Sequence, residues 1–97
     1  MKYKMIVLDV DGTLLTDEQT ISTRTRATLL KVQQMGVRVV LASGRPTHGV
    51  MPLARALELD KNGGFVLSYN GAQIIHVPTG ERVFDRRGAP PLLSHLG

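Results

Sequence analysis

Short runs of apolar residues alternate with longer mixed stretches along most of the chain. The apolar runs cover residues 4–10, 37–42 and 65–69, and each ends at polar or turn-forming residues. Continuous apolar runs of this length, rich in β-branched residues, are typical of strands buried on both faces. The stretches between them, residues 23–35 and 46–59, are expected to form helices. The order strand, helix, strand, helix, strand predicts an α/β fold with parallel strands.

The ends of the expected helices carry recognisable signals. Ser22 suits the N-cap of the first helix, and Gly36 suits the position just after its last turn. Pro46 suits the first position of the second helix. Pro52 lies inside that helix and removes an internal hydrogen bond, so we expect a kink there or a division into two helices. Before the first helix, residues 11–20 are polar and are expected to form a loop or flap.

The pattern changes after the third strand. Residues 72–77 and 82–85 flank the turn-forming tetrapeptide Pro78-Thr79-Gly80-Glu81, which predicts a β-hairpin. Residues 86–97 contain two consecutive prolines and show no sustained period, so this segment is expected to be irregular.

The predicted topology leaves part of the sheet uncovered. Crossovers between parallel strands are right-handed, so a sheet that grows in one direction carries both helices on the same face. The first strand then lies at an edge, although its composition calls for neighbours on both sides. In complete doubly wound folds, further strands and helices cover these surfaces. The chain is therefore expected to form an incomplete Rossmann-like parallel sheet (βαβαβ) followed by a β-hairpin.

Composition narrows the class of protein. A chain of 97 residues with 42% hydrophobic residues suits one small domain with a modest core. The net charge of +4 comes from scattered basic residues without interleaved aromatic residues, which argues against a nucleic-acid partner. No apolar run approaches the length of a membrane helix, and no signal peptide is recognisable, so a cytoplasmic protein without membrane contact is expected. The absence of cysteine excludes disulfides and thiolate metal sites.

The first candidate site lies where the first strand ends. Asp9 and Asp11 are two positions apart and are followed by Gly12, which lets the chain turn away sharply. Carboxylates this close repel each other, and Mg²⁺ is a usual counter-ion that keeps both ionised. One carboxylate can then attack phosphorus while the other acts as acid and base. The alternative is an ordinary polar turn after a strand.

The string DVDGTLL in this context resembles motif one of the haloacid dehalogenase-like phosphatases. The resemblance implies that Asp9 forms an aspartyl-phosphate and that Asp11 is the general acid and base. It further implies that Mg²⁺ binds the Asp9 side chain and the Asp11 backbone carbonyl. Thr13 would help to hold the phosphate through its hydroxyl.

The second candidate site, Ser43-Gly44-Arg45-Pro46, follows the second strand. A hydroxyl beside a helix N-terminus favours anions, and the alternative is an ordinary N-cap with a first-turn proline. The string LASGRP resembles motif two of the same family and the Cof-type subgroup, which hydrolyses sugar phosphates and related metabolites. The resemblance implies that Ser43 and Gly44 bind the phosphoryl group. Arg45 would orient this loop or the substrate.

The third candidate site, Asn70-Gly71, follows the third strand. Asn-Gly is a strong signal for a type I′ hairpin turn. A turn and a role in the site are both open interpretations of this dipeptide. The string YNGAQIIHVPTGERVF resembles the segment that leads from the third strand towards the cap domain in Cof-type proteins. On that resemblance, Asn70 lines the active site.

The resemblance covers residues 1–85, which match the N-terminal part of the family's Rossmann-like core. The catalytic lysine and the Gly-Asp-x-x-Asn-Asp string that follow in the family have no counterpart in the sequence. Residues 86–97 are then an irregular tail or a truncated cap linker. The expected function is hydrolysis of small phosphate monoesters with Mg²⁺, in a truncated and inactive N-terminal fragment. The alternative is a non-catalytic module that binds another protein or a second copy through the bare sheet face or the edge strand.

Overall fold

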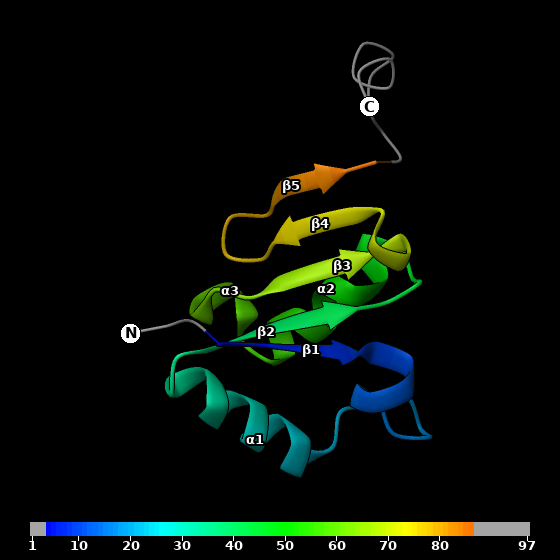
Figure 1. The fold of residues 1–97 in the computed structure, drawn as a ribbon. Coiled ribbons are helices and arrows are strands. Elements are labelled where there is room, and N and C mark those ends of the chain that lie inside the picture. The colour runs from blue at the N-terminus through cyan, green and yellow to red at the C-terminus, as the bar shows by residue number, and fades with distance from the viewer. Residues whose placement is uncertain (1–3, 87–97) are drawn as a thin grey trace.

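The computed structural model describes residues 4–86, whose centre is one mixed sheet (Figure 1). The sheet has five strands in the order β1-β2-β3-β4-β5. Neighbouring strands are parallel from β1 to β3 and antiparallel from β3 to β5. The α/β fold and the hairpin after the parallel strands are therefore confirmed. The strands are β1 (Lys4–Asp9), β2 (Val37–Ala42), β3 (Phe65–Ser68), β4 (Gln73–His76) and β5 (Glu81–Asp85).

The first helix follows its sequence signals. Helix α1 (Thr23–Gln34) begins after Ser22, whose hydroxyl oxygen accepts a hydrogen bond from the Thr25 amide at 3.1 Å. This bond satisfies one of the amide groups that the first helical turn leaves without a partner. Gly36 has a φ of +93° just after the helix, which is the left-handed conformation expected at that position.

The second helical stretch is divided, but not where the sequence suggests. Helix α2 (Thr47–Ala56) runs through Pro52 without interruption, and α3 (Leu59–Asn62) is a separate short helix. The break lies at Glu58, whose φ of 59° is left-handed. Pro52 is on the exposed side of α2. A division at Pro52 is therefore wrong, because a left-handed residue turns the chain more sharply than an exposed proline does.

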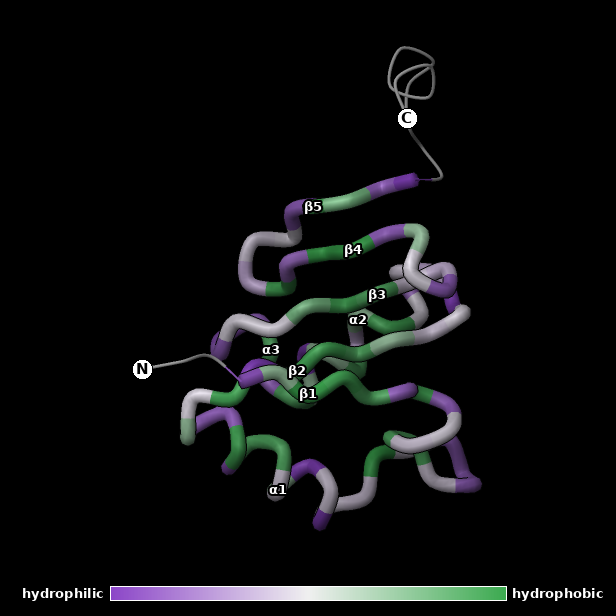
Figure 2. The backbone as a smooth tube through the Cα atoms, in the orientation of Figure 1, coloured by the Kyte–Doolittle hydropathy of each residue, from purple (hydrophilic) through white to green (hydrophobic). Residues whose placement is uncertain are grey.

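The core lies between the sheet and its helices, and Figure 2 shows that strands and helices both carry hydrophobic residues. Val39, Leu41 and Val66 from the strands are fully buried against Val50 and Leu57 from the helical layer. These side chains alternate along each strand with residues that point to the opposite face. The hydrophobic core cluster within residues 4–86 thus lies on one face of the sheet.

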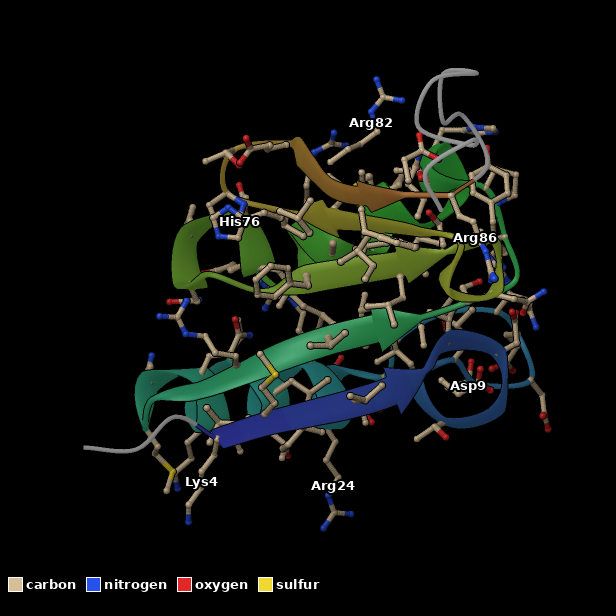
Figure 3. The ribbon with its side chains drawn as sticks, turned by 45° about the horizontal axis from the view of Figure 1, so that its top comes forward. Lys4, Asp9, Arg24, His76, Arg82 and Arg86 are labelled. Atoms are coloured by element: carbon tan, nitrogen blue, oxygen red, sulfur yellow. The ribbon has the colours of Figure 1, made fainter. Side chains whose placement is uncertain are left out.

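The opposite face of the sheet is not covered by any element within residues 4–86, and Figure 3 shows the helices behind the sheet in that view. Met5 and Val7 of β1 are 60% and 61% exposed. They line an apolar hollow together with Val40, Phe65, Leu67 and Ile74. The expected bare face and edge strand are confirmed, whereas the expectation that β1 is buried on both faces is wrong for the described residues. Right-handed crossovers place α1 and α2 on the same side, as the topology requires.

The described part of the chain ends just after β5. The Arg86 amide donates a hydrogen bond to the Ala72 carbonyl at 2.7 Å, which ties the end of the hairpin to the loop before β4. The rest of the expected irregular segment, residues 87–97, lies outside the described residues. Within residues 4–86, no helix has the length and apolar character needed to span a membrane.

Candidate active site

The register of the parallel strands brings the candidate motifs to one edge of the sheet. Asp9 pairs with Ala42, and Ala42 pairs with Leu67 on the next strand. The residues that follow these positions therefore leave the sheet side by side, at the end of β1 where Asp9 is labelled in Figure 3. Two backbone hydrogen bonds of 2.9 Å join the loops, from the Ser43 amide to the Leu67 carbonyl and from the Asn70 amide to the Ser43 carbonyl.

Residues 11–20 are expected to form a loop, and the structure shows a regular turn in their first part and only turns and bends over residues 15–20. Residues Val10–Leu14 make a π-helical turn, which the Leu15 amide closes by donating to the Val10 carbonyl at 3.0 Å. Val10 and Leu14 are buried and anchor the turn in the core. π-Helical turns are often found at functional sites, and here the turn carries Asp11 away from the end of β1.

Asp9 has a defined orientation at the start of this turn. Its Oδ2 accepts a hydrogen bond of 2.7 Å from the Gly12 amide, so one carboxylate oxygen is held by the backbone. The other oxygen, Oδ1, is left for a substrate or a metal ion.

Four of the candidate residues line one open pocket of about 280 Å³ at this edge: Asp9, Ser43, Gly44 and Asn70. The pocket is completed by Ala42, Leu67 and Gly71. A Cβ at Gly44 would lie 3.0 Å from Asn70 Oδ1, which is closer than side chains usually approach. Glycine at this position thus allows the loops after β2 and β3 to pack against each other.

Ser43 is available to donate a hydrogen bond in this pocket. Its side chain is buried, and its hydroxyl oxygen accepts a hydrogen bond of 2.9 Å from the Arg45 amide. This bond uses an oxygen lone pair and leaves the hydroxyl proton for a ligand. Helix α2 begins at Thr47, with Pro46 as its N-cap residue. The alternative reading of this segment, an N-cap followed by a first-turn proline, is therefore wrong.

For Asn70, the structure shows the hairpin turn and also a place beside the pocket. Asn70 and Gly71 have φ values of 56° and 87°, and the Ala72 amide donates to the Tyr69 carbonyl at 3.2 Å. This is the geometry of a type I′ hairpin turn, here joining β3 to β4. The same turn places Asn70 on the wall of the pocket. A hairpin turn and a place beside the pocket are thus compatible.

The remaining candidates lie outside this pocket. The Arg45 guanidinium is directed to the π-helical turn, where its Nη2 is 2.5 Å from Asp11 Oδ1. Thr13 lines a different hollow, together with Leu8 and side chains of α1. Asp11 is linked to the loop after β2 by this ion pair with Arg45. Thr13 and Ser43 line different pockets, so the structure does not bring them together. The phosphate-binding role of Thr13 stays a prediction.

The structure also shows polar contacts that the sequence did not reveal. Arg45 Nη2 donates a second hydrogen bond, of 2.8 Å, to Gln19 Oε1. The hydroxyl oxygens of Thr47 and Ser68 are 2.6 Å apart, and Gln73 Nε2 donates a hydrogen bond to Asp85 Oδ2 at 3.0 Å. Gln19 lies in a polar loop without a motif, so no pattern marks it. Ser68 and Gln73 are register partners on β3 and β4, which becomes visible only once the strands are paired.

The acidic residues suit a hard divalent cation. Mg²⁺ is commonly held by one or two carboxylates, with waters and substrate phosphate completing its octahedron. Asp9 has a carboxylate oxygen that no described hydrogen bond uses, and the backbone carbonyl of Asp11 belongs to the neighbouring π-helical turn. Within residues 4–86, no group of three or more His, Cys, Asp or Glu side chains forms a larger metal cluster. The donor set present fits Mg²⁺ with few protein ligands.

Comparison with known proteins finds relatives of this chain among hydrolases. The sequence profile of the haloacid dehalogenase-like hydrolases matches residues 6–93. The chain is 34% identical over 97 residues to phosphatase YwpJ of Bacillus subtilis, covering 96% of this chain and 33% of YwpJ. It is 39% identical over 71 residues to 5-amino-6-(5-phospho-D-ribitylamino)uracil phosphatase YcsE of the same organism, covering 73% of this chain and 27% of YcsE.

A solved structure gives the same result. The crystal structure of a haloacid dehalogenase-like hydrolase from Bacteroides thetaiotaomicron superposes with a TM-score of 0.83 and 52% sequence identity. The match covers 87% of this chain and 32% of that protein, so this chain spans about a third of the length of the proteins it matches. With the profile matching nearly the whole chain, the protein belongs to the haloacid dehalogenase-like hydrolases.

Proposed function

We propose that these residues form the nucleophile half of a Mg²⁺-dependent phosphate monoester hydrolase. The observation that carries the proposal is the shared pocket: the Asp9 carboxylate faces it together with Ser43, whose hydroxyl proton is free to donate. A nucleophile and a hydrogen-bond donor for phosphoryl oxygens on one wall suit in-line attack on phosphorus. The phosphatase names of curated relatives support the same reaction class.

The reaction divides between the two carboxylates. Asp9 Oδ1 forms a bond to phosphorus as the bond from phosphorus to the leaving oxygen breaks, and Asp11 donates a proton to that oxygen. In the second half, Asp11 takes a proton from a water molecule, which attacks phosphorus and releases the Asp9 carboxylate together with inorganic phosphate. The Gly12 amide holds Asp9 Oδ2 throughout, so the nucleophilic oxygen keeps its direction.

Ser43, Gly44 and Asn70 would hold the phosphoryl oxygens during transfer, because all three line the pocket with Asp9. The Asp9 side chain and the Asp11 backbone carbonyl would hold Mg²⁺, which when bound neutralises charge on the phosphoryl group. Since the contacts available are to the phosphoryl group, we propose small phosphorylated molecules, such as the sugar phosphates of the Cof-type subgroup, as substrates. A cysteine-free chain suits a reducing compartment, and we propose the cytoplasm.

The experiment that tests this function transplants residues 1–86 into phosphatase YwpJ, a curated relative that the chain matches over nearly its whole length. Asp9→Asn in the chimera is then expected to remove Mg²⁺-dependent hydrolysis of a phosphate monoester. A chimera that folds and hydrolyses no phosphate ester even with Asp9 present would contradict the proposed function.

The 97 residues by themselves are expected to hydrolyse phosphate esters poorly. Lys61 is the last lysine of the sequence, so the later residues supply no lysine to balance charge in phosphoryl transfer at the pocket. Loss of one such group costs about 10²–10³ in rate. We expect p-nitrophenyl phosphate hydrolysis in Mg²⁺ to be close to that of the Asp9→Asn variant. Robust turnover that Asp9→Asn abolishes would contradict this expectation.

A second candidate function is self-association, which the bare sheet face favours. The apolar hollow around Met5, Val7 and Phe65 is partly formed by the edge strand β1, which carries Met5 and Val7. Apolar surface of this kind on an unpartnered sheet is typical of contact with another chain, here a second copy. Sedimentation velocity should show association that increases with concentration and is lost in Val7→Glu. Met35→Glu on the helical side, where Met35 is 68% exposed, is the matched control. A stable monomer at all concentrations would rule this candidate out.

A further inference from the structure

A single guanidinium nitrogen joins three segments that are separate in the sequence. Arg45 Nη2, from the loop between β2 and α2, donates at 2.5 Å to Asp11 Oδ1 on the π-helical turn and at 2.8 Å to Gln19 Oε1. The nitrogen carries two hydrogens, so it can serve both acceptors at once. We call these three residues the Gln19–Arg45–Asp11 clamp.

The Asp11 carboxylate needs such support. Its side chain is 51% exposed, and among residues 4–86 the described hydrogen bonds that reach its carboxylate come from Arg45. A free carboxylate on a surface turn exchanges between rotamers, whereas proton transfer requires a fixed position within hydrogen-bonding reach. An isolated exposed ion pair contributes little to order, because two flexible side chains must be held together in water. Arg45 alone is therefore a weak anchor for Asp11.

Gln19 supplies the second point of attachment. Gln19 has a left-handed backbone conformation, with a φ of 63°. Its backbone N–H donates a hydrogen bond to the Thr16 carbonyl at 2.9 Å. The Thr16 hydroxyl accepts from the Thr20 amide at 3.3 Å, so the turn that carries Gln19 is closed by its own hydrogen bonds. The amide oxygen of Gln19 is a neutral acceptor. It can orient the guanidinium without competing with Asp11 for the positive charge.

We propose that Gln19 is a positioning residue, which acts through Arg45 to hold the Asp11 carboxylate in place for proton transfer. The inference rests on the proposed function for the role of Asp11, but the clamp itself is observable in the chain without turnover. Its consequence is that the turn at residues 16–20 and the acid-base group move as one unit. In this arrangement Arg45 serves Asp11 directly and the phosphate only indirectly.

Nuclear magnetic resonance of the full 97-residue chain tests the proposal. Two signals are followed: rotation of the Arg45 guanidinium about its Cζ–Nη bonds, from the side-chain ¹⁵N resonances, and the ¹³C resonance of the Asp11 carboxyl. In Gln19→Ala, we expect the rotation rate of Arg45 to rise about fivefold, as the loss of one hydrogen bond of ordinary strength implies. The Asp11 carboxyl resonance should shift in the same variant. Gln19→Glu, which competes for the guanidinium, should also shift it.

Two comparisons separate positioning from a structural role of Gln19 in its turn. Thr16→Val removes the hydroxyl that closes the turn but leaves the Gln19 side chain, so it should move the amide signals of the turn much more than the Asp11 carboxyl signal. Arg26, which bonds to the Ala56 carbonyl at 2.8 Å, is an internal reference that no Gln19 variant should affect. Unchanged Arg45 and Asp11 signals in a folded Gln19→Ala chain would overturn the proposal. Failure of the proposed phosphatase activity would leave these signals as they are, so the two outcomes can be told apart.

Discussion

Asp9→Asn in a chimera of residues 1–86 with phosphatase YwpJ is expected to lower kcat/KM for a phosphate monoester by at least about 10³-fold. The amide has nearly the shape of the carboxylate and can keep its oxygen on the Gly12 amide, so the pocket should retain its form. What disappears is the anionic oxygen that bonds to phosphorus, together with the charge that holds Mg²⁺. The loss should therefore appear mainly in kcat. Steady-state hydrolysis of p-nitrophenyl phosphate in Mg²⁺ measures it.

Asp60→Asn in the same chimera is the matched control. Asp60 is exposed on α3, in the helical layer on the other side of the sheet. Its replacement by Asn makes the same change in charge and shape as Asp9→Asn. Its kcat/KM should stay within about twofold of the parent chimera, since a surface substitution away from special features changes little. A chimera in which Asp9→Asn and Asp60→Asn behave alike would show that Asp9 is not the nucleophile.

Gly64→Ala is expected to destabilise the chain by about 3 kcal/mol, at the upper end of the cost of overfilling a packed interior. A Cβ at Gly64 would lie 2.5 Å from the Val39 carbonyl oxygen and 3.0 Å from two carbons of Leu59. Two backbone hydrogen bonds hold Gly64 in place: its amide donates to the Leu59 carbonyl at 3.2 Å, and its carbonyl accepts from the Val77 amide at 3.0 Å. Urea denaturation followed by circular dichroism should show a midpoint lower by roughly 2 M at an unchanged slope.

Gly49→Ala makes the same chemical change where the structure has room. Its Cβ would meet Arg45 Cβ at 3.6 Å, an ordinary contact, within helix α2. Alanine is favoured over glycine in helices, so the stability should stay the same or rise by up to about 1 kcal/mol. If Gly64→Ala and Gly49→Ala unfold at the same urea concentration, the close approach of the Gly64 backbone to β2 does not require glycine.

Much of the fold could be predicted because it depends on short-range signals and on chirality. The apolar runs mark the parallel strands, and the turn tetrapeptide after Val77 marks the hairpin. Right-handed crossovers then place both long helices on one face, which explains why Met5 and Val7 are exposed. The place where the helical stretch divides was not predicted, because the left-handed backbone at Glu58 has no sequence signal as strong as that of Pro52.

The candidate site divides in the same way. Residues at the carboxyl ends of neighbouring parallel strands meet at one edge, so the strand order is enough to predict that Asp9 and Ser43 lie close together, whereas the sequence leaves the place of Asn70 open. The paths of the loops beyond that edge are visible only in the folded chain. The π-helical turn directs Asp11 towards Arg45, and a turn without a motif brings Gln19 to the same guanidinium. These contacts depend on the paths of three loops relative to one another, and such paths are set by packing and closure rather than by any local pattern of residues.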